Sequence, residues 1–200
     1  MRFIESPSGI ILAGGSSRRM GQDKALLPFP GADPPRTFLE ELIRTLDYCC
    51  SEVFIVARDQ EQASQYAFTD TEIVLDSIPG GGPLVGLASA LQAVSTDYAV
   101  LVAVDMPFVT PQLLAFMILH YEDGKALVPL VNGHPQVTLA IYPRSILHII
   151  DDLIRQGRRD LRSLLDAAPV RYIDGEELRM VDPALRSFVG VNTPEDLARL

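Results

Sequence analysis

Three cationic side chains and two adjacent glycines lie close together near the start of the chain. Gly14 and Gly15 end a short apolar run, and Arg18, Arg19 and Lys24 follow within ten positions. Glycine lets backbone N–H groups approach an anion closely, because it has no Cβ. Arginine offers phosphate a planar fork of donors, and lysine offers a compact charge. Together these residues predict a site for a nucleotide triphosphate.

The spacing of these glycines differs from that of the two common phosphate-binding loops. The adjacent pair Gly14 and Gly15 does not fit GxGxxG, and Gly21 and Lys24 are three positions apart, whereas GxxxxGK[ST] needs them adjacent. The alternative is a Gly-Gly turn before a solvated basic segment, because such dipeptides mark turns. The position after a first strand, and the concentration of cations in a chain of net charge −9, favour the ligand site.

Two carboxylates are predicted to lie beside this loop. In an open α/β sheet, ligands bind beyond the carboxyl ends of the strands. The glycine loop, Asp76 and Asp105 follow three predicted strands, at residues 9–12, 73–75 and 99–104 respectively. Because parallel strands end at one edge of their sheet, these three features should converge on one site.

Asp105 ends a run that is otherwise apolar. An unpaired carboxylate is costly in such surroundings unless it binds a cation. Mg²⁺ prefers hard oxygen ligands and often uses one or two carboxylates together with substrate phosphates. Asp105 is therefore the predicted magnesium ligand, and the alternative is a helix cap or a turn residue before Pro107.

Asp76 precedes the glycine-rich segment at residues 80–82. Its carboxylate could accept hydrogen bonds from N1–H and the exocyclic amine of guanine, or from a ribose hydroxyl. The alternative is an Asx turn that opens the glycine-rich loop.

Strand-like and helix-like runs alternate along the first half of the chain. The predicted strands span residues 9–12, 52–57, 73–75 and 99–104, and the predicted helices span residues 37–48, 83–93 and 112–120. The alternation β-α-β-α-β-α-β predicts an α/β fold with three layers, in which helices cover both faces of an open, mostly parallel sheet.

The second half predicts an antiparallel addition to this sheet. Asn132 and Gly133 form a strong hairpin signal between predicted strands at residues 126–130 and 136–141. Further predicted helices span residues 145–156, 160–166 and 194–200, and further short strands span residues 170–173 and 187–191.

Length, charge and cysteine content limit the class of protein. The 200 residues predict a single domain over residues 1–200. A net charge of −9 argues against nucleic acid as a partner. There is no apolar run of 18 residues for a membrane span and no evident signal peptide. Cys49 and Cys50 are adjacent and are the only cysteines, which favours a reducing, cytoplasmic location.

Residues 12–28, LAGGSSRRMGQDKALLP, resemble the motif of the molybdenum cofactor guanylyltransferases, which belong to the nucleotidyltransferase superfamily. That motif consists of LAGG, RMG and DK, followed by a short apolar tail. The similarity continues at residues 76–86, 103–108, 133–136 and 191–197. The chain departs from the family pattern at Val137 and Gly190, and no asparagine ends its second predicted strand.

The resemblance implies a Rossmann-like nucleotidyltransferase fold with a nucleotide-binding part at about residues 1–110 and an acceptor-binding part at about residues 111–200. Arg19, Lys24 and Asp105 would be catalytic, with Lys24 at the transferring phosphate and Arg19 at the outgoing pyrophosphate, while Arg18 points to solvent. Asp105 and Asn192 would bind Mg²⁺, or Asn192 would cap the last helix. The implied nucleotide-binding residues are Leu12, Ala13, Gly14, Gly15, Lys24, Asp76 and Asp105.

The implied activity is transfer of GMP from GTP to the terminal phosphate of molybdopterin, which releases pyrophosphate and forms a guanine dinucleotide cofactor. Transient contacts with other cofactor-biosynthesis enzymes, or with the enzymes that accept the product, are also expected. The alternatives are the same chemistry with CTP or a sugar phosphate, and a nucleotide-binding module without catalysis. Lys24 and Asp105 argue against the inactive module, and the missing GxGxxG argues against a dehydrogenase.

Overall fold

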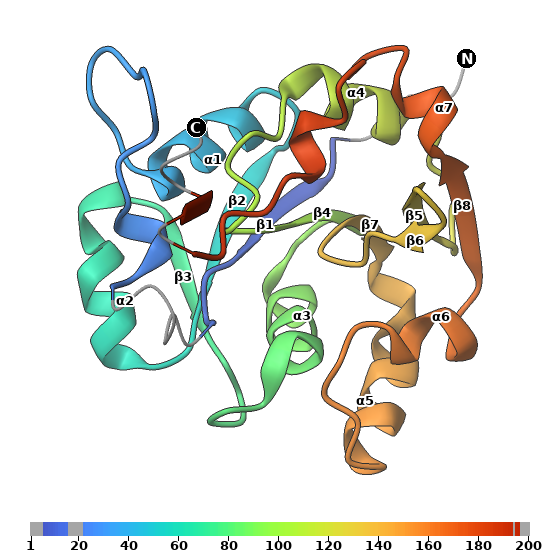
Figure 1. Cartoon of the computed structure of the whole chain (residues 1–200). Coiled ribbons are helices and arrows are strands. Elements are labelled where there is room, and N and C mark those ends of the chain that lie inside the picture. Colours follow the sequence, from blue (N-terminus) through green and yellow to red (C-terminus); the bar gives the residue numbers. More distant parts are fainter. Residues whose placement is uncertain (1–5, 16–21, 194, 197–200) are drawn as a thin grey trace.

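A mixed sheet forms the centre of the protein (Figure 1). The computed structural model describes residues 6–15, 22–193 and 195–196. Its eight strands follow the order β3-β2-β1-β4-β7-β5-β6, and β8 also pairs with β5. The strands span Ser8–Leu12 (β1), Glu52–Ala57 (β2), Glu72–Leu75 (β3), Tyr98–Ala103 (β4), Ala126–Val131 (β5), His134–Pro135 (β6), Leu139–Pro143 (β7) and Val170–Asp174 (β8).

Strands β1 to β4 are parallel, β7 adds to β4 in the antiparallel direction, and β8 runs parallel to β5. The predicted sheet, mostly parallel with an antiparallel addition, is therefore confirmed. The α-helices span Phe38–Asp47 (α1), Gln60–Tyr66 (α2), Gly82–Ala93 (α3), Pro111–Leu119 (α4), Leu147–Arg155 (α5), Ser163–Ala167 (α6) and Gly175–Leu178 (α7). Within the described part of the chain, no helix is both long and apolar enough to cross a membrane.

Both faces of the sheet are buried under helices, as the three-layer prediction requires. Consecutive strand residues point to opposite faces, and Ile10 and Ile11 are both fully buried. Ile11 belongs to a core cluster with residues of α1, α2 and α4, whereas Ile10 belongs to a second cluster with residues of α3, α5 and α6. Figure 1 shows α3 and α5 on one side of the sheet and α1 on the other.

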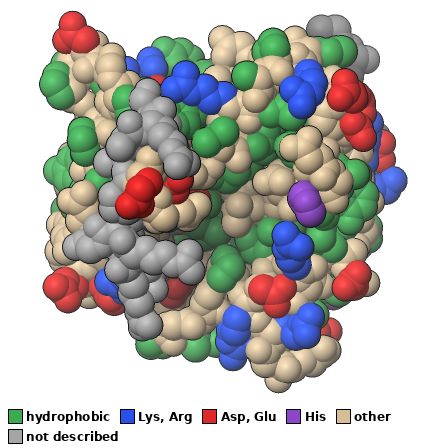
Figure 2. All heavy atoms as spheres, in the orientation of Figure 1, with side chains coloured by type: hydrophobic (Ala, Val, Ile, Leu, Met, Phe, Trp, Pro, Cys, Tyr) green, Lys and Arg blue, Asp and Glu red, His purple; other side chains and the backbone are tan. Residues whose placement is uncertain are grey.

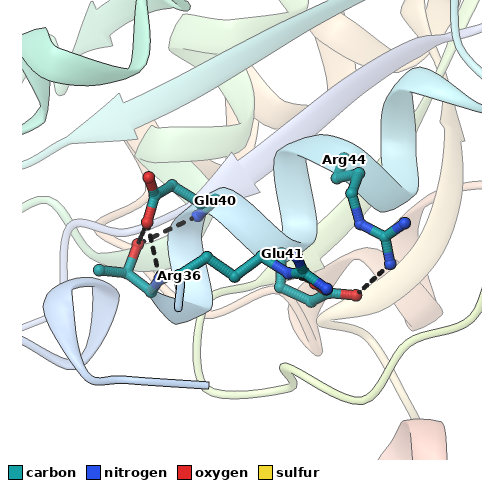
Figure 3. Close-up of polar contacts among 5 residues, drawn as sticks. Arg36, Glu40, Glu41 and Arg44 are labelled. Atoms are coloured by element: carbon teal, nitrogen blue, oxygen red, sulfur yellow. Dashed lines mark hydrogen bonds and ion pairs between the residues drawn. The ribbon is translucent and has the colours of Figure 1, made fainter. Parts of the chain in front are cut away.

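The start of α1 is fixed by a capping box and by a buried carboxylate (Figure 3). Thr37 Oγ1 accepts a hydrogen bond from Glu40 N–H, and Thr37 N–H donates to Glu40 Oε2 at 2.7 Å. Glu41 is buried between two arginines: Arg36 Nε pairs with Glu41 Oε2, and Arg44 Nη2 donates to Glu41 Oε1 at 2.9 Å. These contacts anchor the chain that leads from the first loop into α1.

The predicted hairpin forms, but its second strand is interrupted. Asn132 and Gly133 have φ angles of 51° and 75°, the left-handed values that a tight hairpin turn requires. The pairing of β5 with β6 ends after two residue pairs, and β7 begins only at Leu139. Gln136 N–H still donates to Pro129 O at 2.9 Å, but residues 136–138 belong to neither strand, so the predicted strand over residues 136–141 is wrong at its start. This interruption turns Thr138 toward the end of β4, where Ala103 N–H donates to its carbonyl at 2.9 Å.

Several other predicted elements need correction. Helix α2 occupies the connection between β2 and β3, where no helix had been placed. Residues 187–191 do not form a strand, because Arg186–Phe188 is a short 3₁₀ turn (η4) and the residues after it make no strand pairing. The helices predicted at residues 145–156 and 160–166 are shorter, at Leu147–Arg155 and Ser163–Ala167. The helix predicted at residues 194–200 lies mostly outside the described residues.

Candidate functional site

The three predicted strand-end features meet at a cavity of about 600 Å³. Strand β1 ends one residue before Ala13, β3 ends one residue before Asp76, and β4 ends two residues before Asp105. The face of the molecule drawn in Figure 2 is hollowed near its middle. The cavity is lined by Leu12, Ala13, Gly14, Gly15, Lys24, Val56, Arg58, Asp76, Gly80, Gly82, Pro83, Gly86, Ala103, Val104, Asp105 and Thr138.

Lys24 holds two oxygen-bearing side chains together at one side of this cavity. Its Nζ donates to Asn192 Oδ1 at 2.8 Å and lies 3.5 Å from Asp105 Oδ2. Lys24 and Asn192 are 168 positions apart in the sequence. The side chains of Lys24 and Asp105 are 15% and 31% exposed, so solvent only partly screens their attraction. The structure therefore brings together the three predicted residues Lys24, Asp105 and Asn192.

Among the described residues, neither Asp105 nor Asn192 caps a helix with its side chain. Thr110 caps α4, because its Oγ1 accepts from Leu113 N–H at 3.3 Å, so the helix-cap alternative for Asp105 is wrong. At the other end of the chain, Thr193 Oγ1 accepts from Asp196 N–H at 3.2 Å. The side chains of Asp105 and Asn192 are thus left to face the cation at Lys24.

The segment that carries Asn192 is attached directly to the Asp105 loop. Val191 N–H donates to Asp105 O at 2.7 Å. The Val191 side chain is fully buried in a small apolar cluster with Leu27, Phe38 and Phe108. Burial of a valine contributes about 1.5 kcal/mol or more. This cluster links the segment after Lys24, the loop after β4 and the C-terminal segment. It therefore holds Lys24, Asp105 and Asn192 in fixed positions relative to one another.

Asp76 occupies a narrow slot between two glycines. A Cβ on Gly86 would lie 3.1 Å from Asp76 Oδ1, and a Cβ on Gly14 would lie 3.4 Å from Asp76 Oδ2. Both glycines thus leave room for the carboxylate. Asp76 Oδ1 is buried and has no hydrogen-bond partner among the described residues. An unpaired buried acceptor costs about 1–3 kcal/mol, so a ligand that brings a donor to this atom would recover that energy.

Burial raises the pKa of Asp76 from 3.8 to about 6. We expect the Asp76→Asn variant to melt about 3 °C higher than the parent at pH 8, because the folded parent carries the full penalty of a buried charge above pH 6. As pH falls from 6 toward 3.8, the folded carboxylate takes up its proton first, so the penalty disappears and the two proteins should converge near pH 4. Thermal unfolding across pH 4–8 measures this.

The exposed carboxylate of Asp70 provides the control for that measurement. Asp70 has a left-handed backbone with a φ of 54°, which asparagine also tolerates, so Asp70→Asn should leave the melting curve almost unchanged. A difference between Asp76→Asn and the parent that is equal at pH 4 and pH 8 would contradict the assigned pKa.

The donor set around Lys24 fits a hard divalent cation. Asp105 Oδ2 and Asn192 Oδ1 both approach one positive group, the Lys24 ammonium, so the two oxygens already converge on a cation. A carboxylate and an amide carbonyl are ligands that Mg²⁺ accepts, and this ion usually completes its shell with waters and substrate phosphates. Magnesium binding at Asp105 and Asn192 stays a prediction.

Arg18 and Arg19 lie outside the described residues. Arg18 was predicted to point to solvent, and Arg19 was predicted to contact the outgoing pyrophosphate. Sequence reasoning missed three other residues. Arg58 and Thr138 line the cavity, and Gln62 of α2 contacts the residue before Lys24. Gln62 follows Asp59 at the spacing of an N-cap and its N3 residue, which is the signal that would have indicated this helix.

Comparisons with known proteins agree with this arrangement. Residues 9–172 match the family model described as the MobA-like NTP transferase domain. A probable molybdenum cofactor guanylyltransferase of Chloroflexus aggregans is 40% identical over 195 residues, which cover 95% of this chain and 91% of that protein. The probable molybdenum cofactor guanylyltransferase of Pelotomaculum thermopropionicum is 33% identical over 192 residues, which cover 96% and 90%.

The crystal structure of molybdopterin-guanine dinucleotide biosynthesis protein A from Archaeoglobus fulgidus superimposes with a TM-score of 0.80 at 31% identity, covering 96% of this chain and 95% of that one. The chain therefore belongs to the family of MobA-like NTP transferase domains that includes the molybdenum cofactor guanylyltransferases, and it is an enzyme of the nucleotidyltransferase class.

Proposed function

We propose that this enzyme transfers GMP from GTP to the terminal phosphate of molybdopterin, releasing pyrophosphate and forming a guanine dinucleotide cofactor. The convergence of Lys24, Asp105 and Asn192 on one side of the cavity, with Asp76 in its wall, carries this proposal. The cavity volume of about 600 Å³ falls in the range of small-molecule sites. The names of the relatives supply the nucleotide and the acceptor.

The reaction requires charge neutralisation more than proton transfer. An oxygen of the acceptor phosphate attacks the α-phosphorus of GTP, the bond from that phosphorus to the bridging oxygen breaks, and pyrophosphate leaves with the electron pair. The acceptor phosphate is already ionised, so no strong general base is needed. Transfer of this kind depends on alignment and on electrostatic stabilisation of the phosphate oxygens.

In this scheme Lys24 stabilises the charge on the transferring phosphate, and Arg19 contacts the outgoing pyrophosphate. Asp105 and Asn192 would hold Mg²⁺, which supplies Lewis-acid neutralisation of the phosphates when it is bound. The ammonium of Lys24 is held at the cavity by Asn192 Oδ1, so it is oriented before substrate arrives. Such preorganisation lowers the cost of reaching the transition state.

Asp76 provides the proposed contact to the nucleoside. A carboxylate in this slot can accept hydrogen bonds from N1–H and the exocyclic amine of guanine. The unpaired, buried Oδ1 supports this role, because a ligand donor would satisfy it. The backbone from Leu12 to Gly15 borders the same cavity and is proposed to contact the nucleotide beside Asp76.

Base preference is tested by pyrophosphate release with molybdopterin and each of the four nucleoside triphosphates. We expect release with GTP at least tenfold faster than with ATP, CTP or UTP, because a site built to hydrogen-bond one base edge rejects bases that lack the donors. Reactions without molybdopterin provide the blank. Release with CTP alone would contradict the guanine assignment, and release with none of the four would contradict nucleotidyl transfer to this acceptor.

A further inference from the structure

Helix α2 contributes a buried glutamine that contacts three strand-end or loop segments around the cavity. Gln62 is 2% exposed. Its Nε2 donates to Ala13 O at 3.1 Å and to Asp23 Oδ2 at 2.8 Å, and its Oε1 accepts from Arg58 N–H at 2.8 Å. Because Arg58 N–H can only donate and Ala13 O can only accept, these partners determine which end of the amide faces which segment.

The glutamine is itself fixed by the start of its helix. Asp59 caps α2, and its Oδ1 accepts from Gln62 N–H at 2.8 Å. In a full capping box the Gln62 side chain would reach back to the N–H of the cap residue. Here it points instead to Ala13, Asp23 and Arg58. The helix start thus orients Gln62 toward the site.

Asp23, the residue before Lys24, is held on both of its carboxylate oxygens. Its Oδ2 accepts from Gln62 Nε2 and also from Tyr66 OH at 2.7 Å, and its Oδ1 accepts from Ala25 N–H at 3.0 Å. Burial, followed by the neighbouring Asp23 carboxylate, raises the pKa of Tyr66 above its usual range. Tyr66 therefore keeps its proton and acts as a donor. Asp23 joins α2 to the 3₁₀ turn that Lys24 begins.

We propose that Gln62, together with Tyr66, is a positioning residue that acts through Asp23 to place the Lys24 ammonium against the phosphates of the substrate. This inference rests on the proposed function in one respect, namely that Lys24 binds an anionic phosphate. Three hydrogen bonds to Asp23, two of them from α2, restrain the residue next to Lys24, and Lys24 Nζ then meets Asn192 Oδ1 and Asp105 Oδ2. A displacement of about 1 Å in such a group can cost about a hundredfold in rate.

A double-mutant cycle on GTP binding tests this role without requiring turnover. The probe is GTP with magnesium and without molybdopterin, titrated by calorimetry into the parent, Lys24→Ala, Gln62→Leu and the double variant. We expect about tenfold weaker binding for Lys24→Ala and about fivefold weaker binding for Gln62→Leu, since loss of the Gln62 hydrogen bond to the Asp23 carboxylate releases the residue next to Lys24. In the Lys24→Ala background, Gln62→Leu should weaken binding by less than about twofold, because its effect passes through Lys24.

Tyr66→Phe is the second, gentler arm of the cycle. It removes only the hydroxyl that donates to Asp23 Oδ2, so it keeps the fold even if Gln62→Leu does not. We expect about threefold weaker GTP binding, and this effect should disappear in the Lys24→Ala background. Gln65→Leu, on the exposed side of α2, is the matched control and should bind GTP like the parent.

The outcomes separate this role from a merely structural one. Parent-like affinity in Tyr66→Phe, or a loss that persists undiminished without Lys24, would overturn the positioning role, since a general effect on stability does not depend on Lys24. A second outcome is that the losses of affinity depend on Lys24 but the enzyme releases no pyrophosphate from GTP. That outcome would overturn the proposed function and leave the positioning role in place. If the enzyme turns over but the losses of affinity are the same with and without Lys24, only the positioning role is overturned.

Discussion

Replacing Asp105 with alanine is expected to lower kcat about a thousandfold or more while the protein stays folded. The carboxylate lies 3.5 Å from Lys24 Nζ at the edge of the cavity, where phosphate charge must be neutralised during transfer. Removal of a single electrostatic group at a reacting phosphate or oxyanion typically costs about a hundredfold to a thousandfold, and loss of a metal ligand adds to this. Pyrophosphate release from GTP and molybdopterin at saturating substrate measures the effect.

Stability should change little in this variant, because the fold uses the backbone of Asp105 rather than its carboxylate. Val191 N–H donates to the carbonyl of Asp105, and alanine retains that carbonyl. Asp166→Ala, which removes an exposed carboxylate from α6, is the matched control and should retain parent-like turnover. Turnover of Asp105→Ala within about threefold of the parent would exclude Asp105 from the reacting centre.

Replacing Lys24 with alanine has the second largest expected effect, a fall of about a hundredfold or more in kcat/KM for GTP. The Lys24 side chain is only 15% exposed, and its ammonium is oriented by Asn192 Oδ1 at 2.8 Å, so the charge is preorganised beside the cavity. A charge-assisted hydrogen bond to a phosphate oxygen is about twice as strong as a neutral one. Its removal leaves the negative charge of the transferring phosphate without a compensating cation. Initial rates at varied GTP concentration separate the effect on kcat from that on KM.

Lys125→Ala provides the control for this change. Lys125 pairs with Glu122 on the surface, where an ion pair contributes about 0–1 kcal/mol, so its loss should affect neither stability nor turnover. If Lys24→Ala raised KM alone and left kcat at the parent value, Lys24 would bind ground state and transition state equally and would have no specific role in transfer.

The location of the site was predictable from sequence because it depends on strand order. Asp105 follows the buried strand β4, Asp76 follows the partly exposed edge strand β3, and parallel strands bring their carboxyl ends to one edge of the sheet. The contact of Lys24 with Asn192 was not predictable in this way, since 168 positions separate them and the described residues around Asn192 belong to no strand. The family motif, rather than any periodicity, indicated that Asn192 belongs to the site.

Helix α2 escaped prediction because it is short and largely polar. Only Ala63 and Tyr66 supply buried apolar side chains, which is too few for a helical pattern to emerge. The helix is instead held by polar contacts, among them those of Gln62, which no hydrophobic pattern reports. The residues that support Lys24 were therefore less visible in the sequence than Lys24 itself.

Residues 187–191 were misread as a strand for a related reason. Three apolar residues among these five suggest a short strand, but Val191 is buried in the separate cluster beside Phe108, and its N–H bonds to Asp105 rather than to a neighbouring strand. A local pattern could not distinguish pairing within the sheet from packing against a loop. The break at residues 136–138 has the same origin, because Thr138 contacts the end of β4 instead of continuing the hairpin.

The proposed transfer is tested most directly by following the two parts of the nucleotide in the molybdopterin assay. With GTP labelled at the α-phosphate, we predict that the label appears in the molybdopterin product, joined through a new phosphate–phosphate bond, while label in the β- and γ-phosphates appears in pyrophosphate. Equal amounts of the two products should form, and neither should form with Asp105→Ala. Transfer of the γ-label to molybdopterin, or its release as orthophosphate while the α-label stays on unbound nucleotide, would contradict nucleotidyl transfer at this site.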